Sequence, residues 1–576
     1  MSKVLYVMKR HGGVDAADTD RLDLVAERLV PDNLAAERVV HDKRIAGQLA
    51  ILIVNDRGSF TRVGNSLLCG RALTRGNAWS RPGGPLPSGD YALFREAPAC
   101  LELATNSVGS RTLWYYLDDH YFLAATSQRA IVLFLGDFRF DPDVVPWMLS
   151  SGSLGPALAW DSRIHRLPAS ARLCLDRRRW TTTLHCETPA FQAEGDRQWL
   201  KRRLSERIEA SVTSLTEDLD GWTLPLSGGY DSRAILCYLA RTMPDVGQIR
   251  TLTWGVQSER ERSGGDARVA ARLADTMGVG HRFQTTDIAR EPVSGILDRF
   301  LLCSEGRIDH LAAYADGMAI WRQLHDEGVK GIIRGDEGFG WIPVTSPASV
   351  RLRTGCAMCR DFENLAVLQD RYGLPEQRFP EGLERHGNES LEAWRDRLYH
   401  SFRMPTVLAA LSDVKLSYIE QVNPLVYDDI IAIVRQIPDA LRENKALFRE
   451  IVDDIGPDVP YAVTGANAPV TELLANQGIV DHIRITLQEA RDDGVLPGAL
   501  IDHLLDGIQG KGATSGRQAR LIRFIKRRVP SHFKSRLRDT LVKPRVDPYV
   551  LAFRAYILVR MNVLLNQDAQ AASALP

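Results

Sequence analysis

A short run of small and polar residues, SGGYDS, directly follows the apolar stretch WTLPL. Gly228 and Gly229 have no side chains, so the backbone can turn tightly there and a ligand can approach it closely. A helix is expected to begin at about Asp231, and the first amides of a helix point outward, unpaired, at its positive end. Ser227 and Ser232 add hydroxyl donors. The run therefore predicts a phosphate-binding loop in which Asp231 holds Mg²⁺ against the phosphates.

Two interpretations of this loop are open. The simpler one is a tight strand–helix turn in which Asp231 or a serine caps the helix. An aspartate and a second serine at these spacings after an apolar strand favour the nucleotide site. No lysine follows, so this is not the GxxxxGK[ST] loop of enzymes that transfer a γ-phosphate.

A second polar loop, RGDEGFG, follows the apolar run VKGII. In open α/β sheets, ligands bind at the edge where the carboxyl ends of the strands meet. Asp336 is therefore predicted to share Mg²⁺ with Asp231, and Gly335 to lie at the nucleotide. Glu337 is predicted to orient an amine or the loop, and Arg334 to supply positive charge. In the alternative, Asp336 and Glu337 cap the next helix and Arg334 pairs with one of them.

The elements that must position these loops change character along the chain. Residues 1–190 contain short apolar runs separated by turn signals, which is typical of an antiparallel sandwich. A helix is expected from about Trp199 to Glu217. From about residue 200, three apolar strands alternate with helices, which favours a parallel α/β sheet. Beyond residue 345 the pattern is mainly helical.

Composition excludes little. Lys+Arg and Asp+Glu both total 72, so net charge indicates neither a nucleic-acid nor a membrane partner. Eight cysteines form no framework, which favours a reducing cytoplasm. The N-terminus lacks the apolar core of a signal peptide, and no uninterrupted apolar run is long enough for a membrane span. A soluble cytoplasmic protein is expected.

The motif SGGYDS resembles the signature of the ATP-pyrophosphatase superfamily, whose members bind the leaving pyrophosphate at this loop. Further stretches resemble its asparagine synthetase-like branch over nearly the whole chain. IRTLTWG, which contains Thr253, is similar to the strand that contributes to the adenosine pocket. RGDEGFG is similar to the family's second signature. The later helical stretch has matching residues at Pro424, Asp428, Lys445 and Arg449.

The resemblance implies a fold of two parts, α/β combined with α+β. TNSVGSRTLWYY and IHRLPAS parallel the family's glutaminase domain, so residues 1–195 are expected to form a glutaminase-like (Ntn-type) antiparallel β-sandwich. Residues 196–576 are expected to form a parallel-sheet α/β ATP-pyrophosphatase domain with a basic helical extension. ATP and Mg²⁺ are the implied cofactors.

Several family features are missing. Glutamine-hydrolysing members begin Met-Cys, whereas this chain has Ser2 and no equivalents of the glutamine-holding motifs between residues 30 and 90. A catalytically silent glutaminase-like domain is therefore expected. The family's acid or tyrosine that helps to deprotonate the attacking amine is replaced by Ile333. The family's catalytic lysine has no obvious equivalent, and the alternatives are Lys445 and Lys511.

Loss of the glutaminase resembles lasso peptide cyclases and β-lactam synthetases, which use an amine already present on the substrate. The leading hypothesis is an AMP-forming macrolactam ligase that acts on a peptide with a carboxylate and an amine, with a leader-peptide protease as partner. Asp336, Glu337, Arg334 and Lys445 are the predicted catalytic residues. One alternative is an asparagine synthetase or another small-molecule amide or β-lactam synthetase. The other is a non-catalytic ATP-binding scaffold in a biosynthetic complex.

Three other features have open interpretations. Cys356 and Cys359 form one CxxC pair without a second pair for zinc, so metal binding is not expected there. His310 is interpreted as a packing residue or a substrate contact, and the same choice applies to its neighbours Glu305, Arg307 and Asp309. The basic stretch 511–545 is interpreted as a solvated helix or a docking surface for an acidic partner, and its few aromatic residues make nucleic acid unlikely.

Overall fold

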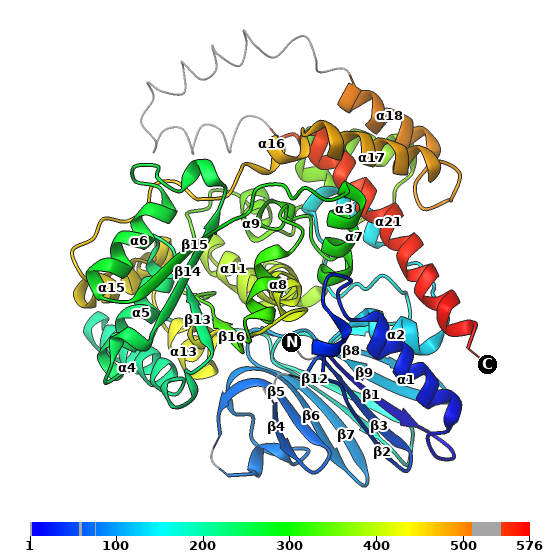
Figure 1. Ribbon diagram of the computed structural model, residues 1–576, viewed down its shortest axis with the longest axis horizontal. Helices are drawn as coiled ribbons and strands as arrows, with labels where there is room; N and C mark the ends of the chain where they lie inside the picture. The colour runs from blue at the N-terminus through cyan, green and yellow to red at the C-terminus, as the bar shows by residue number, and fades with distance from the viewer. Residues whose placement is uncertain (1–2, 57–59, 75, 510–542, 576) are drawn as a thin grey trace.

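The computed structural model describes residues 3–56, 60–74, 76–509 and 543–575 (Figure 1). The N-terminal part contains two six-stranded antiparallel sheets. The first sheet has the order β10(His165–Arg166), β8(Trp114–Leu117), β9(Tyr121–Ala125), β1(Lys3–Lys9), β3(Leu49–Val54), β2(Asp42–Ala46). The second has the order β12(Thr181–Cys186), β11(Ala171–Asp176), β7(Cys100–Thr105), β6(Ser88–Ala97), β5(Ser66–Leu73), β4(Phe60–Val63).

The central strands of the first sheet, β1 and β3, are buried on both faces. Val4, Tyr6 and Met8 of β1 pack into a core shared with the second sheet. Leu5 and Val7 of the same strand belong to a core that includes α1(Ala16–Arg28) and α2(Gln128–Leu135). A strand covered on both faces has no polar face, which explains the continuous apolar runs of β1 and β3. The antiparallel sheets predicted for this part are confirmed, with a helical layer added.

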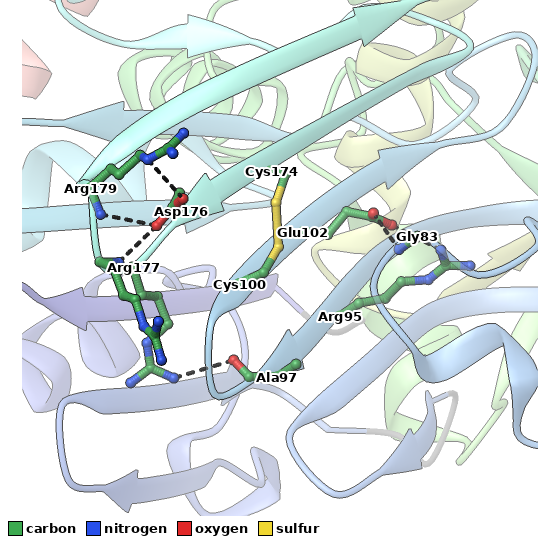
Figure 2. Close-up of a disulfide and its surroundings, with 10 residues drawn as sticks. Gly83, Arg95, Ala97, Cys100, Glu102, Cys174, Asp176, Arg177 and Arg179 are labelled. Atoms are coloured by element: carbon green, nitrogen blue, oxygen red, sulfur yellow. Dashed lines mark hydrogen bonds and ion pairs between the residues drawn. A yellow bond between two sulfur atoms is a disulfide. The ribbon is translucent and has the colours of Figure 1, made fainter.

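One pair of cysteines departs from the expected reduced state. Cys100 on β7 and Cys174 on the neighbouring strand β11 form a disulfide with Cα atoms 6.4 Å apart (Figure 2). The buried pair Arg95–Glu102 lies beside it. Cys356 and Cys359 stay as buried thiols, and burial raises the pKa of each to about 12. Within the described residues, no group of three or more His, Cys, Asp or Glu side chains could hold a metal.

A five-stranded parallel sheet forms the centre of the second part. Its order is β15(Gly280–Thr285), β14(Arg250–Gly255), β13(Trp222–Pro225), β16(Gly331–Ile333), β17(Glu420–Val422). Trp222 of β13 pairs with Gly331 of β16, so the predicted adjacency of these strands is confirmed. The pattern predicts three strands here. The structure adds β15 and β17, which lack an apolar run.

Helices make up most of the remaining structure. They include α4(Arg197–Thr213), α5(Tyr230–Thr242), α6(Asp266–Met277), α7(Val293–Ser304), α8(Ala319–Asp326), α12(Ala409–Leu416) and α15(Ala446–Ile455). The others are α3(Val144–Ser151), α9(Pro347–Thr354), α10(Glu363–Tyr372), α11(Leu391–Leu398), α13(Asp428–Val434), α14(Asp439–Arg442), α16(Val470–Leu474), α17(Gln477–Glu489), α18(Gly498–Gln509) and α21(Pro548–Ser573). The π-helical segment η9(Tyr399–Leu408) joins α11 to α12. The predicted boundary after residue 195 lies between β12 and α4.

The helix α21 is long and apolar enough to cross a membrane by length and composition alone. However, 61% of its most apolar window is buried inside the protein, as in the core helix of a soluble protein. It packs against α2, α3, α17 and α18 along one side of the molecule (Figure 1). Most of the basic segment 511–545, together with Lys511, lies outside the described residues.

Buried polar contacts join the two parts. Arg111 forms an ion pair with Glu420 at 2.6 Å and also donates to the carbonyl of Gln421. Asp428 accepts hydrogen bonds from the amides of Gly89 and Ser107. Asp428, which matches the synthetase pattern in sequence, therefore holds the interface.

Candidate active site

A cavity of about 690 Å³ opens at the carboxyl ends of β13, β14 and β16. Several predicted site residues line it: Ser227, Asp231, Ser232, Thr253, Arg334, Gly335 and Asp336. Glu337 and Lys445 are not in its wall. They form an ion pair with each other, and Lys445 also contacts Asp231, which is in the wall. Gly228 and Gly229 shape the loop behind Ser227. The two polar loops, which are about a hundred residues apart in sequence, thus meet at one sheet edge.

The loop after β13 is held by its own serines. The Ser227 amide donates to Ser232 Oγ at 2.9 Å, and the Gly229 amide donates to Ser227 Oγ at 3.3 Å. The Gly228 amide donates to Asp266 Oδ1 at 2.8 Å. Gly229 occupies the N-cap position of α5, where no side chain caps the helix. The alternative in which Asp231 or a serine caps α5 is therefore wrong, and the first amides of α5 remain for an anion.

Space explains the glycine at position 228. Neither Gly228 nor Gly229 adopts the left-handed conformation. A Cβ atom at Gly228 would lie 2.5 Å from Ala462 Cβ and 3.0 Å from Val269 Cβ. A Cβ atom at Gly335 would lie 3.1 Å from Asp231 Cβ. The missing side chain at Gly335 thus allows the loop after β16 to pack against the start of α5.

Lys445 connects the acids of the two loops. Its Nζ lies 3.0 Å from both carboxylate oxygens of Asp231 and 2.6 Å from Glu337 Oε1. Burial alone would lower the pKa of Lys445, but the Glu337 and Asp231 carboxylates outweigh burial and raise it. Burial raises the pKa of Glu337 to about 7 against the opposing effect of Lys445. Of the two predicted lysines, Lys445 is thus the one that the described structure brings to the loop.

Arg334 and Asp336 form a second pair at 3.1 Å. The guanidinium also lies over the ring of Trp254, 5.8 Å from its centroid. Neither Asp336 nor Glu337 caps the next helix, because α9 is capped by Ser346. The pairing of Arg334 with an acid, however, agrees with the alternative interpretation of this loop.

The residues fit the nucleotide and metal that the loops imply. The uncapped start of α5 suits a pyrophosphate, and protonated Lys445 adds positive charge beside it. Asp231 and Asp336 line the same cavity. Mg²⁺ at nucleotide sites is commonly held by one or two carboxylates together with phosphates, so two acids suffice without a three-residue metal cluster. Thr253 Oγ1 donates to the Leu226 carbonyl, so this hydroxyl holds the loop while its residue lines the cavity.

The far end of the cavity contains residues with open interpretations. Asp309 and His310 line it, together with Arg554 of α21, which lies 2.7 Å from Asp309. Glu305 and Arg307 are not in this wall. Arg307 ion-pairs with Asp413, and Glu305 lies 3.6 Å from Lys3. Asp309 and His310 therefore face the cavity, whereas Glu305 and Arg307 form buried ion pairs outside its wall.

The sequence patterns miss some lining residues. Lys415 of α12, Tyr314, Asn467 and Arg554 all line the cavity. None belongs to a recognisable motif, and all but Tyr314 lie far from both loops in the chain. The one signal available was a lysine within the largely apolar stretch of α12, LAALSDVKLSYI.

Comparison with known proteins agrees with this geometry. Residues 203–315 match the family model of asparagine synthase. This segment is asparagine synthetase-like. It contains the loop 227–232 and Thr253 and ends before Arg334. The match supports an ATP-dependent, amide-forming ligase in general.

Other comparisons add little. No curated protein matches the chain. A solved structure described as the allosteric regulatory enzyme of purine biosynthesis is similar over 57% of this chain and 89% of that one. The identity is 10% and the TM-score 0.21, so this similarity carries no argument.

Proposed function

We propose that the protein is an AMP-forming ligase that closes a macrolactam ring in a peptide, in the manner of lasso peptide cyclases. The observation that supports it best is that Ser227, Asp231 and Asp336 line one cavity, with Lys445 paired to Asp231. A substrate carboxylate oxygen attacks the α-phosphorus of ATP, and pyrophosphate leaves towards the start of α5. An amine of the same peptide then attacks the acyl carbon. The carbon–oxygen bond to AMP breaks, and an amide forms.

Each charged group has a distinct part in this scheme. The amides of α5 and the Lys445 ammonium stabilise the negative charge that builds on the leaving pyrophosphate. When bound by Asp231 and Asp336, Mg²⁺ would neutralise phosphate charge. Glu337 keeps Lys445 in place, and Arg334 holds Asp336 at the cavity wall.

The amine is proposed to come from the substrate because the sequence lacks the motifs that hold glutamine. Tethering the amine next to the acyl adenylate gives it a high effective concentration. We expect no glutamate release from glutamine and no effect of Ser2→Ala on ligation. Glutamate release that is lost in Ser2→Ala would contradict this. We take the attacking amine to be the N-terminus of the substrate peptide. This amine becomes free when a leader segment is cleaved from the peptide, so a leader-peptide protease is the proposed partner.

The test uses synthetic peptides that have a free N-terminus and an internal Asp or Glu, each paired with its N-acetylated form. With Mg·ATP, both forms should support exchange of radiolabelled pyrophosphate into ATP. Only the free form should lose the mass of one water and release AMP. If pyrophosphate exchange occurs but free ammonia, and not the amine of the peptide, is incorporated into the product, the protein is a small-molecule amide synthetase. ATP binding without exchange for any peptide would contradict the ligase proposal and favour a scaffold.

A further inference from the structure

Lys415 is a buried cation in the wall of the same cavity. It lies on α12 and its side chain is 3% exposed. Its Nζ donates to Tyr314 Oη at 3.2 Å and to the carbonyl of Leu411. The rings of Tyr314 and Trp321 each have their centroid 5.9 Å from Nζ. The amine therefore sits among aromatic rings and two neutral acceptors.

Asp336 and Asp413 favour the ammonium form of Lys415, but burial and the charge of Arg334 outweigh them. No acid of the described chain forms an ion pair with it, whereas Lys445 has two such partners. Arg334 repels it from the loop after β16, and Asp336 in that loop is paired with Arg334. Asp413 on its own helix is paired with Arg307. Burial, reinforced by Arg334, lowers the pKa of Lys415 to about 7.

The other bases of the cavity are already engaged. Asp231 accepts from Lys445, Asp336 from Arg334 and Asp266 from the Gly228 amide. Asp309 is held by Arg554 and by the ring of His310. Amide formation from an amine releases one proton, which needs an acceptor near the acyl carbon. Among the described lining residues, Lys415 and Asp266 are the bases without a charged partner, and the Asp266 carboxylate is committed to the Gly228 amide of the phosphate loop.

We propose that the neutral amine of Lys415 accepts this proton. This rests on the proposed ligase function. The nitrogen lone pair of the substrate amine forms the bond to the acyl carbon, AMP leaves with the electron pair of the broken carbon–oxygen bond, and the N–H proton moves to Lys415 Nζ. Tyr314 Oη, as hydrogen-bond partner, keeps Nζ turned towards the cavity. The proton then passes to solvent when the product leaves.

The first experiment separates the two half-reactions. Lys415→Met should lower the rate of ring closure about 10²-fold. Pyrophosphate exchange with the same peptide should change much less. Hydroxylamine, a weakly basic nucleophile, should trap the acyl adenylate in the variant as well as in the unaltered protein. Lys415→Arg should be as slow as Lys415→Met, because a guanidinium cannot accept the proton. Lys330→Met, at an exposed lysine outside the cavity, is the matched control.

Two outcomes of that experiment would overturn the proposal. If Lys415→Met abolishes exchange as strongly as ring closure, Lys415 serves adenylation. If Lys415→Arg restores the rate, its role is structural. Failure of the unaltered protein to close any ring would instead count against the ligase function, and the next measurement distinguishes the two failures.

The second experiment needs no substrate. Trace acetylation with acetic anhydride across a pH series, followed by mass spectrometry, reports the uncharged fraction of each lysine. Lys415 should become reactive several pH units below Lys330 in the same sample. A midpoint shared with Lys330, or no labelling of Lys415 at any pH, would show a charged or unreachable amine and would overturn the proposal.

Discussion

Asp231 joins the phosphate loop to Lys445 and to the loop after β16. It lies in the first turn of α5, accepts from Lys445 and packs against Gly335. Removal of its carboxylate leaves Lys445 paired with Glu337 alone, and it removes one of the two acids proposed for Mg²⁺. The side chain is one-third exposed, so the loss should cost function more than stability.

Asp231→Ala is therefore expected to weaken binding of Mg·ATP at least tenfold and to abolish pyrophosphate exchange. Titration calorimetry with Mg·ATP measures the first effect without a peptide. The exposed Asp220→Ala is the matched control. Unchanged binding by a folded Asp231→Ala protein would exclude Asp231 from the nucleotide site.

Lys415 should reduce stability at neutral pH. Its pKa is about 7 in the folded protein and about 10.5 when unfolded. Between these values the unfolded chain binds more protons, so the contribution of Lys415 to stability rises with pH through this window. Lys415→Met should thus be more stable than the unaltered protein at about pH 7, by roughly 1–4 kcal/mol. Urea unfolding should show that the advantage shrinks towards about pH 10. An advantage independent of pH would contradict the assignment of an uncharged lysine.

Single residues show the limit of prediction from sequence. The positions of Ser227, Asp231 and Asp336 could be predicted because each belongs to a polar run that follows an apolar strand. The choice between Lys445 and Lys511 could not be made, since it depends on where the chain returns after many intervening helices. Lys415 belongs to no recognisable motif. Its proposed role depends on its burial in the cavity wall and on the nearby charge of Arg334, which are seen only in the structure.

At the scale of elements, the two strands that the sequence misses are explained by their surroundings. β15 is an edge strand whose residues are exposed or half-buried, so it needs no apolar run. β17 is buried, but it is short and uses Glu420 and Gln421 for contacts with Arg111. By contrast, β1 and β3 are buried on both faces, so each has a continuous apolar run that can be recognised in the sequence.

The packing of the loop 226–229 against its neighbours makes a prediction about Gly228. Gly228→Ala places a methyl group against Ala462 and Val269 and should destabilise the protein by about 1–3 kcal/mol. Adding Ala462→Gly should recover part of that loss, because it removes the nearer contact. Chemical unfolding of the single and double variants measures both. A fully additive double variant would show that the two sites do not touch.

At the scale of the whole molecule, the N-terminal part is bound to the part that contains the parallel sheet through buried charge. Arg111 and Glu420 are both nearly fully buried. Breaking a buried pair on one side leaves an uncompensated charge, which typically costs about 3–5 kcal/mol. This loss is expected to affect both parts, because Arg111 also contacts Asp90 on β6 of the second antiparallel sheet.

Arg111→Met should therefore lower the free energy of unfolding by about 3–5 kcal/mol. The double variant Arg111→Met/Glu420→Met should recover part of that loss, since the Glu420 charge is then removed and only Asp90 loses its charged neighbour. Equal destabilisation in the single and double variants would show that the methionine packing, and not the charge, is at fault. Neither variant touches the cavity wall.

The helix α21 determines when the cavity can exist. It is synthesised after every other described element, yet it contributes Arg554 to the cavity and fixes α2 of the N-terminal part through Asp568 and Arg129. Domains usually fold from the N-terminus as they leave the ribosome. Here α2 and the candidate site depend on a segment translated hundreds of codons later, so a nascent chain would carry an unfinished cavity until translation has passed α21.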